Sequence, residues 1–286
     1  MDVKVTGVSA TTDVLARLER CYDAIPRTGG ARVEKSGPFE LFVREGPGWP
    51  YYARPRLGTT TVTSADVESL RERQRELGVP EALEWVEDLT PALLPAARVA
   101  GLSVLLAPLM VLDPAALPDP ASLADATVTF LDPDGPGFPD AYARSGAVAQ
   151  IGFAAAGTGV GEAGPVERDA AATVPDPAAV ELAAAAIRAG TKAQAVAETV
   201  AEGVLATGAF QGAEGAAEVV GVATLPAARR RGLGAAVSAG LARHALAIGY
   251  DLVFLSAASA DVARVYARIG FQRVGTACIA EPNRAQ

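Results

Sequence analysis

The apolar positions of the second half follow strand and helix periods in turn, which predicts a mixed α/β domain. Residues 218–225 are almost wholly apolar and partly β-branched, as in a buried strand, and residues 234–248 are apolar at helical spacing. A short apolar run at 251–255 predicts the next strand. Upstream, residues 191–211 predict two antiparallel strands that turn near 202–203. The other elements expected here are a strand at 126–131, helices at 141–155 and 177–189, and a glycine-rich loop at 157–173.

The first half has a related order of elements. The expected elements are a helix at 11–25, strands at 39–44 and 51–54, a charged helix opening at 64–68 and ending near 78, a strand at 82–86, a helix at 91–100 and one or two strands at 102–112. Prolines, aspartates and small residues cluster at 112–122, so we expect the domain boundary there.

A turn rich in arginine and glycine joins the 218–225 strand to the following helix. Gly232 and Gly234 carry no Cβ, so the backbone can turn sharply and approach a ligand closely. The first N–H groups of the helix have no intrahelical partner and lie at the positive end of its dipole, so they can solvate phosphate oxygens. We expect Arg229, Arg230 and Arg231 to add mobile positive charge. From these residues alone, an ordinary strand-to-helix connection with solvated arginines stays open as the alternative.

Two motifs together resemble those of the GNAT family of N-acetyltransferases. Arg229-x-x-Gly232-x-Gly234 is similar to the Arg/Gln-x-x-Gly-x-Gly/Ala signature of that family, and residues 262–271 (VARVYARIGF) resemble its helix ending in a tyrosine, a glycine cap and a phenylalanine. The resemblance covers about 217–280. It implies an α/β fold with two GNAT-like domains in tandem: residues 1–122, a degenerate domain without the phosphate turn, and residues 123–286, an acetyl-coenzyme A-binding catalytic domain.

The resemblance also implies roles for particular residues. In the family the strand before the turn splays from the strand after the helix to admit the pantetheine arm, so the backbone of Val222 and Thr224 would pair with that arm. Tyr266 matches the tyrosine that protonates the departing thiolate, with a core tyrosine as the alternative. The residues implied in binding the diphosphate are Arg229, Arg230, Gly232, Leu233, Gly234 and Ala235, with amides from 230 to 235 facing the phosphates.

Two further positions carry weaker expectations. Glu218 lies eleven positions before Arg229, a spacing that resembles that of the general base in some family members; the alternative is a strand-edge glutamate facing solvent. Ser259 stands where the family often has an asparagine, and it would cap the tyrosine helix and donate to the coenzyme. Phe138, Tyr142 and Phe153 are candidates for a substrate-facing surface, with core packing as the alternative.

Composition narrows the class of protein. A length of 286 residues predicts two domains, and 50% hydrophobic with 20% charged residues predicts a folded protein. A net charge of −8 argues against nucleic-acid binding and favours a cationic amine as acceptor. No apolar run reaches membrane-spanning length and the N-terminus lacks a secretory pattern, so we expect a cytoplasmic protein without a membrane partner, as monomer or homodimer.

The reactive side chains are few. Cys21 and Cys278, expected in different halves, form no disulfide framework, and the single His244 cannot build a multi-histidine metal site or a histidine triad, so we expect no metal. The resemblance to the GNAT family implies an acyltransferase that moves an acetyl group from acetyl-coenzyme A to a small amine or a peptide N-terminus, and the two cysteines, without a neighbouring histidine or basic helix start, favour direct transfer. The alternatives are a non-catalytic acyl-coenzyme A sensor or scaffold and, less favoured, a nucleotide-binding domain.

Overall fold

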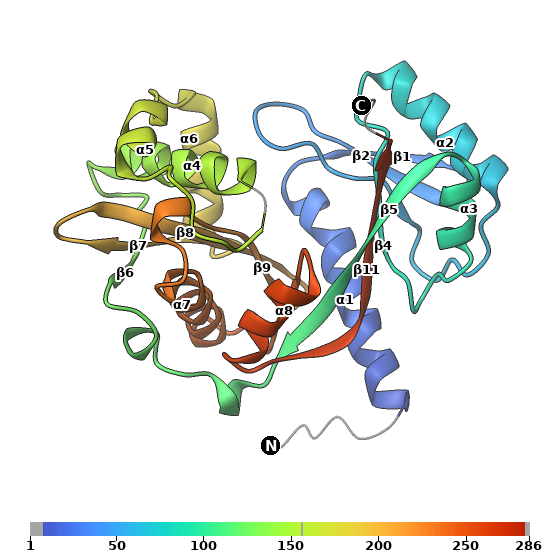
Figure 1. The fold of residues 1–286 in the computed structure, drawn as a ribbon. Coiled ribbons are helices and arrows are strands. Elements are labelled where there is room, and N and C mark those ends of the chain that lie inside the picture. Colours follow the sequence, from blue (N-terminus) through green and yellow to red (C-terminus); the bar gives the residue numbers. More distant parts are fainter. Residues whose placement is uncertain (1–7, 156, 284–286) are drawn as a thin grey trace. The chain divides into compact units, whose positions relative to one another are not determined.

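The protein folds as two compact units. The computed structural model describes residues 8–155 and 157–283. Unit 1 takes the chain up to residue 110 with 256–260 and the segment from 273 onward, and unit 2 takes 111–255 and 261–272 (Figure 1). The change from unit 1 to unit 2 between residues 110 and 111 lies beside the stretch 112–122, where the boundary is expected. This stretch contains two short helices, η1 (Pro114–Ala116) and η2 (Pro120–Ser122), and η2 contacts a helix of unit 2.

A mixed sheet forms the centre of unit 2, with the strand order β10-β9-β8-β7-β6. The pairs β6–β7, β7–β8 and β8–β9 are antiparallel, and the pair β9–β10 is parallel. The strands are β6 (Thr127–Phe130), β7 (Lys192–Thr199), β8 (Gly203–Ala213), β9 (Ala216–Thr224) and β10 (Leu252–Ser256). The helices are α4 (Phe138–Ala154), α5 (Pro165–Ala171), α6 (Pro177–Arg188), η3 (Pro226–Ala228), α7 (Leu233–Ala247) and α8 (Ala260–Ala267).

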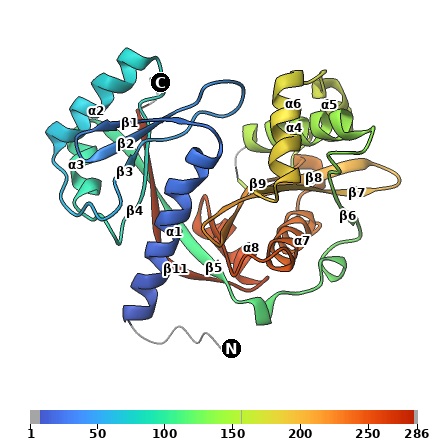
Figure 2. The ribbon, with the colours of Figure 1, turned by 180° about the vertical axis from the view of Figure 1, so that it is seen from behind.

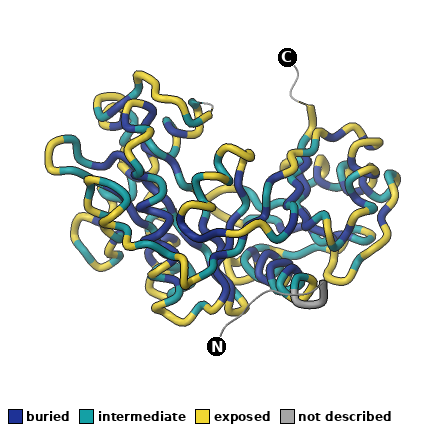
Figure 3. Tube along the Cα trace, turned by 60° about the horizontal axis from the view of Figure 1, so that its bottom comes forward, coloured by how far each residue is buried: buried dark blue, intermediate teal, exposed yellow. Residues whose placement is uncertain are grey.

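Helices α4 and α7 cover opposite faces of this sheet, as Figures 1 and 2 show. The alternation of side chains along β8 explains why. Thr207 is hydrogen-bonded to Ser145 of α4, whereas the ring of Phe210 lies 6.0 Å from that of His244 in α7. Buried residues follow the strands and the helix faces packed on them (Figure 3). A glycine-rich loop is expected at 157–173, but residues 165–171 of it form helix α5, so this expectation is corrected.

Unit 1 pairs strands from both ends of the chain. Its elements are α1 (Val8–Thr28), β1 (Arg32–Ser36), β2 (Phe39–Val43), β3 (Arg54–Pro55), α2 (Ser64–Leu77), β4 (Leu83–Val86), α3 (Leu93–Val99), β5 (Leu102–Leu112) and most of β11 (Phe271–Pro282). Strand β11 is antiparallel to β4 and places Cys278 opposite Trp85, and both side chains are fully buried. The expectation that Cys21 and Cys278 lie in different halves is therefore wrong: both belong to unit 1, as buried free thiols.

A buried ion cluster ties α1 to the strands of unit 1. Arg54 donates to Glu19 at 3.0 Å and to Glu84 at 2.9 Å, and its guanidinium lies 4.2 Å from the ring centre of Tyr22. Glu19 also accepts the N–H of Val86 at 2.8 Å. Arg54 is only 3% exposed, so loss of any one of these three charges would leave a buried charge without its partner. Removal of Arg54, Glu19 or Glu84 alone should therefore destabilise unit 1.

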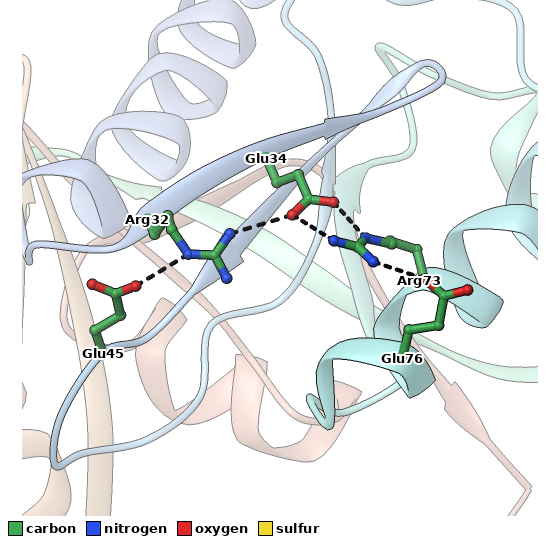
Figure 4. A network of polar contacts seen from close by, with 5 residues as sticks. All are labelled: Arg32, Glu34, Glu45, Arg73 and Glu76. Carbon is green, nitrogen blue, oxygen red and sulfur yellow. Dashed lines mark hydrogen bonds and ion pairs between the residues drawn. The ribbon is translucent and has the colours of Figure 1, made fainter.

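A second network of charges lies on the surface of unit 1 (Figure 4). Arg73 of α2 donates to both Glu34 of β1 and Glu76, and Arg32 links Glu34 to Glu45. Hydrogen bonding from Arg73 lowers the pKa of Glu34. These side chains are in contact with water, so the network contributes less to stability than the buried cluster does. Among the described residues, no helix is long and apolar enough to cross a membrane.

Candidate functional site

The turn between β9 and α7 exposes the N-terminus of a helix. After η3, Arg230 has φ +67° and Gly232 has φ +78°, and α7 begins at Leu233. No side chain caps α7, and its first turn holds no acidic residue. The main-chain amides of residues 232–235 are thus available to an anion.

Strand β9 parts from β10 just before this turn. Their parallel pairing ends at Glu218 and Phe254, although β9 continues to Thr224. On its other side, β9 changes register against β8 between Thr207 and Ala209, a β-bulge that contains Gly221 at φ +63°. Over the stretch that leads to the turn, β9 therefore keeps its pairing with β8 but has none with β10.

The main-chain groups of Val222 and Thr224 face the opened side of β9. Leu225 donates its N–H to Leu205 of β8 at 2.9 Å. Because alternate residues of a strand direct their main-chain groups to opposite sides, Thr224 and Val222 direct theirs away from β8. This is where the family resemblance places the residues that pair with an extended ligand.

The three arginines of the turn are bound by protein groups, so the expectation of mobile charge is corrected. Arg229 donates to the main-chain oxygens of Gly152, Ala155 and Gly159, at 2.9, 2.8 and 3.2 Å. Arg230 donates to the carbonyl of Thr158, at 3.0 Å. Arg231 forms an ion pair with Glu202 at 2.8 Å, which lowers the pKa of Glu202. Carbonyls and a carboxylate within reach outcompete water for these guanidinium groups.

Glu218 is buried at the point where the two strands part. It is 5% exposed, and it accepts a hydrogen bond of 3.0 Å from Gln211, the residue of β8 that is paired with it. The alternative of a solvent-facing strand-edge glutamate is therefore wrong. Gln211 was not identified from the sequence as a partner of Glu218. It is a polar residue at an odd-numbered position of β8, whose even-numbered positions are apolar or glycine, and this alternation places it on the other face of the strand from them.

Tyr266 lies near Ser238 in the second turn of α7, and interaction with that side chain partly offsets the effect of burial on the pKa of Tyr266. Ser238 donates its own proton to the carbonyl of Gly234 at 2.8 Å. Burial raises the pKa of Tyr266 to about 12, so the phenol stays protonated near neutral pH. Ser238 was missed from the sequence, although its place four residues after Gly234 puts both on one helix face.

Comparisons with known proteins agree with this geometry. Residues 194–279 match the family described as FR47-like protein. A GCN5-related N-acetyltransferase from Kribbella flavida superposes with a TM-score of 0.67 at 22% identity, covering 94% of this chain and 96% of that one. A tandem GNAT protein from the clavulanic acid biosynthesis pathway gives 0.54 at 16% identity, covering 96% and 94%.

The protein has the GNAT fold. Because these matches extend over nearly the whole chain, the predictions of an α/β fold and of a tandem arrangement are confirmed. A comparison with curated proteins finds no match.

The first of the two GNAT-like halves closes the helix end that the second leaves open. Helix α2 of unit 1 follows β3 as α7 follows β9, but Thr63 and Asp66 form a reciprocal capping box at its N-terminus. The carboxylate of Asp66 takes up the N–H of Thr63 and places negative charge where a phosphate would have to lie. The charged helix expected to open at 64–68 begins at Ser64, with Thr63 as its cap. The capping box is consistent with the expectation that this half holds no coenzyme.

The remaining candidates differ in exposure. Phe138 is 4% exposed and packs near Tyr142, so it is a core residue, whereas Phe153 is 64% exposed. Ser259 comes directly before α8, and its contact with a coenzyme stays a prediction.

His244 lines a cavity of about 690 Å³ with Phe130 and Tyr250, near the other end of α7. Burial lowers the pKa of His244, as expected of a structural histidine distant from the turn.

Proposed function

We propose that the second half of the chain transfers an acetyl group from acetyl-coenzyme A to an amine. One observation carries the proposal: a protonated phenol, Tyr266, lies near Ser238, which bonds Gly234 at an uncapped helix N-terminus, and the strand before that helix has parted from β10. These features would supply an anion site, an extended binding edge and a proton donor. A thioester carried on a long diphosphate-bearing arm requires all three.

The residues would hold acetyl-coenzyme A as follows. The amides of 230–235 bind the diphosphate, and the main-chain groups of Val222 and Thr224 bind the arm. Bound there, the coenzyme supplies the activated acetyl group. An N–H of β9 polarises the thioester carbonyl, and the site positions the amine against it.

Two side chains would move the protons. Glu218 takes a proton from the amine, directly or through water, as the C–N bond forms. Tyr266 gives its proton to the sulfur as the C–S bond breaks, which leaves an amide and a free thiol. Because the phenol keeps its proton up to high pH, it is available as a donor throughout the neutral range.

Direct transfer is favoured over an acetyl-cysteine route. Cys21 and Cys278 are both buried in unit 1, and burial raises the pKa of Cys278 to about 12. A thiol with such a pKa forms almost no thiolate near neutral pH, and the thiolate is the nucleophile. We propose a small cationic amine or a peptide N-terminus as acceptor, since the net charge is −8.

The test combines binding with turnover. Calorimetry with coenzyme A should give a saturable binding isotherm, and a panel of amines and peptides with acetyl-coenzyme A should release free thiol with at least one acceptor. Binding without thiol release across the panel would replace the enzyme by the coenzyme sensor or scaffold. Absence of binding would refute the proposal.

A further inference from the structure

The segment after α4 is attached to the phosphate turn by hydrogen bonds along its length. Two join main-chain groups: Gly161 N–H donates to Pro226 at 3.1 Å, and Ala227 N–H donates to Ala163 at 2.9 Å. Four more come from Arg229 and Arg230, which donate to carbonyls of the segment. Residues 152–163, here called the strapped segment, thus follow the turn closely; residue 156 is outside the described part.

Close packing accompanies these bonds. A Cβ at Gly152 would lie 2.9 Å from the Cβ of Ala223, and one at Gly161 would lie 3.0 Å from the Cβ of Pro226. The strapped segment therefore runs beside the last residues of β9, which have parted from β10 and lead to the proposed thioester site. Phe153, 64% exposed, belongs to this segment. On the proposed function, this segment would border the route by which an acceptor reaches the thioester.

Arg229 makes the most numerous bonds between the turn and the segment. Its two terminal nitrogens bond three carbonyls, two of which belong to Gly152 and Ala155 at the end of α4. Carbonyls at a helix C-terminus are unsatisfied and carry partial negative charge, so a guanidinium is well suited to them. A guanidinium so committed has few donors left for a phosphate.

We propose that Arg229 is a positioning residue, which fixes the strapped segment against the turn and thereby shapes the acceptor side of the site. This role deepens the proposed transferase function and rests on it. It replaces the coenzyme contact that the signature implies for the side chain of Arg229. The amides of the turn bind the diphosphate, while the arginine side chain determines where the acceptor enters.

The first experiment measures hydrogen exchange without any ligand. In R229Q, the amide of Gly161 should exchange at least about tenfold faster than in the wild type, because the segment opens locally. The matched control is R231Q, which removes the same charge from the same turn but breaks only the contact with Glu202. There the Gly161 amide should exchange at the wild-type rate. Unchanged exchange in R229Q would overturn the proposal.

The second experiment separates positioning from phosphate binding. In R229Q, the KM of the best acceptor should rise at least about fivefold, with coenzyme A affinity within about threefold of the wild type. R229K keeps the charge but has fewer donors, so it should give intermediate exchange and KM, and it serves if R229Q does not fold. Weaker coenzyme binding with an unchanged acceptor KM would make Arg229 a phosphate ligand and overturn the proposal.

The two proposals fail in different ways. A wild type that binds no coenzyme A refutes the transferase, while the exchange comparison still decides whether Arg229 fixes the segment. Faster exchange in R229Q with an unchanged acceptor KM refutes the link to the acceptor and leaves the transferase intact.

Discussion

The two glycines of the turn should respond in opposite ways to substitution by alanine. Gly232 has φ +78°, and a Cβ there would lie 2.0 Å from the carbonyl oxygen of Leu123. Gly234 lies in α7 without a positive φ, and its added Cβ would meet Thr224 Oγ1 at 3.4 Å and Val222 Cγ1 at 3.6 Å, which are ordinary contacts. The signature that Arg229-x-x-Gly232-x-Gly234 resembles allows alanine at the second of these glycines, and the structure gives the reason.

The expected magnitudes follow from these distances. In G232A the left-handed conformation alone costs about 1–2 kcal/mol, and the overlap with Leu123 forces the turn to move as well. A loss of about 2 kcal/mol lowers the Tm by roughly 4–8 °C in a domain of this size. In G234A the added Cβ restricts the unfolded chain, which stabilises the helix by about 0.5–1 kcal/mol.

Coenzyme binding should follow the position of the amides rather than stability. G232A displaces them and should weaken coenzyme A binding at least about tenfold, whereas G234A should stay within about threefold. G234V adds two methyl groups beside Thr224 and should abolish binding in a folded protein. Thermal unfolding by circular dichroism and calorimetry with coenzyme A measure both properties. Wild-type affinity in folded G234V would reject this turn as the diphosphate site.

Three further variants test the chemistry and the fold. Y266F should lower turnover by about 10²- to 10⁴-fold with little change in coenzyme affinity, and a drop below about threefold would make Tyr266 a packing residue. Because the pKa of Tyr266 is raised from 10.0 to about 12, the folded wild type should lose stability as pH rises through that window, and Y266F should lack this loss in pH-dependent unfolding. E218Q should slow transfer mainly on the acidic side of the pH–rate profile, where the amine is protonated; an unchanged profile would leave Glu218 a structural role. R54M leaves two buried carboxylates unpaired and should destabilise unit 1 by about 3–5 kcal/mol in denaturant unfolding, whereas R73M on the exposed network should unfold near the wild-type midpoint.

Local pattern predicted the elements around the site well. Helix α7 was expected at 234–248 and lies at Leu233–Ala247, and the turn near 202–203 separates β7 from β8 as expected. These elements depend on periodicity and on glycines, which act within a few residues. The same locality explains the error at α5, where glycines concealed a short helix whose buried Arg168 bonds to carbonyls of Glu202 and Val204.

Side-chain partners depended on residues far apart in the chain. Arg229 has the signature spacing, but its acceptors lie seventy or more positions away, so the sequence did not show that its guanidinium is engaged. Glu218 presented the same difficulty, because its burial depends on where β9 parts from β10. A residue type and its spacing state which bonds a side chain can make, not which acceptors the fold brings near.

The sequence by itself determined the glycine turn before α7 and the absence of such a turn from the first half, since both depend on residues close together in the chain. The closure of α2 by Thr63 and Asp66 is local as well. Tertiary structure decided that β9 parts from β10 before the turn and which acceptors its arginines reach. It also decided that β11 completes unit 1. Strand pairing and the choice among nearby acceptors are settled by packing between distant segments, and no local period encodes that packing.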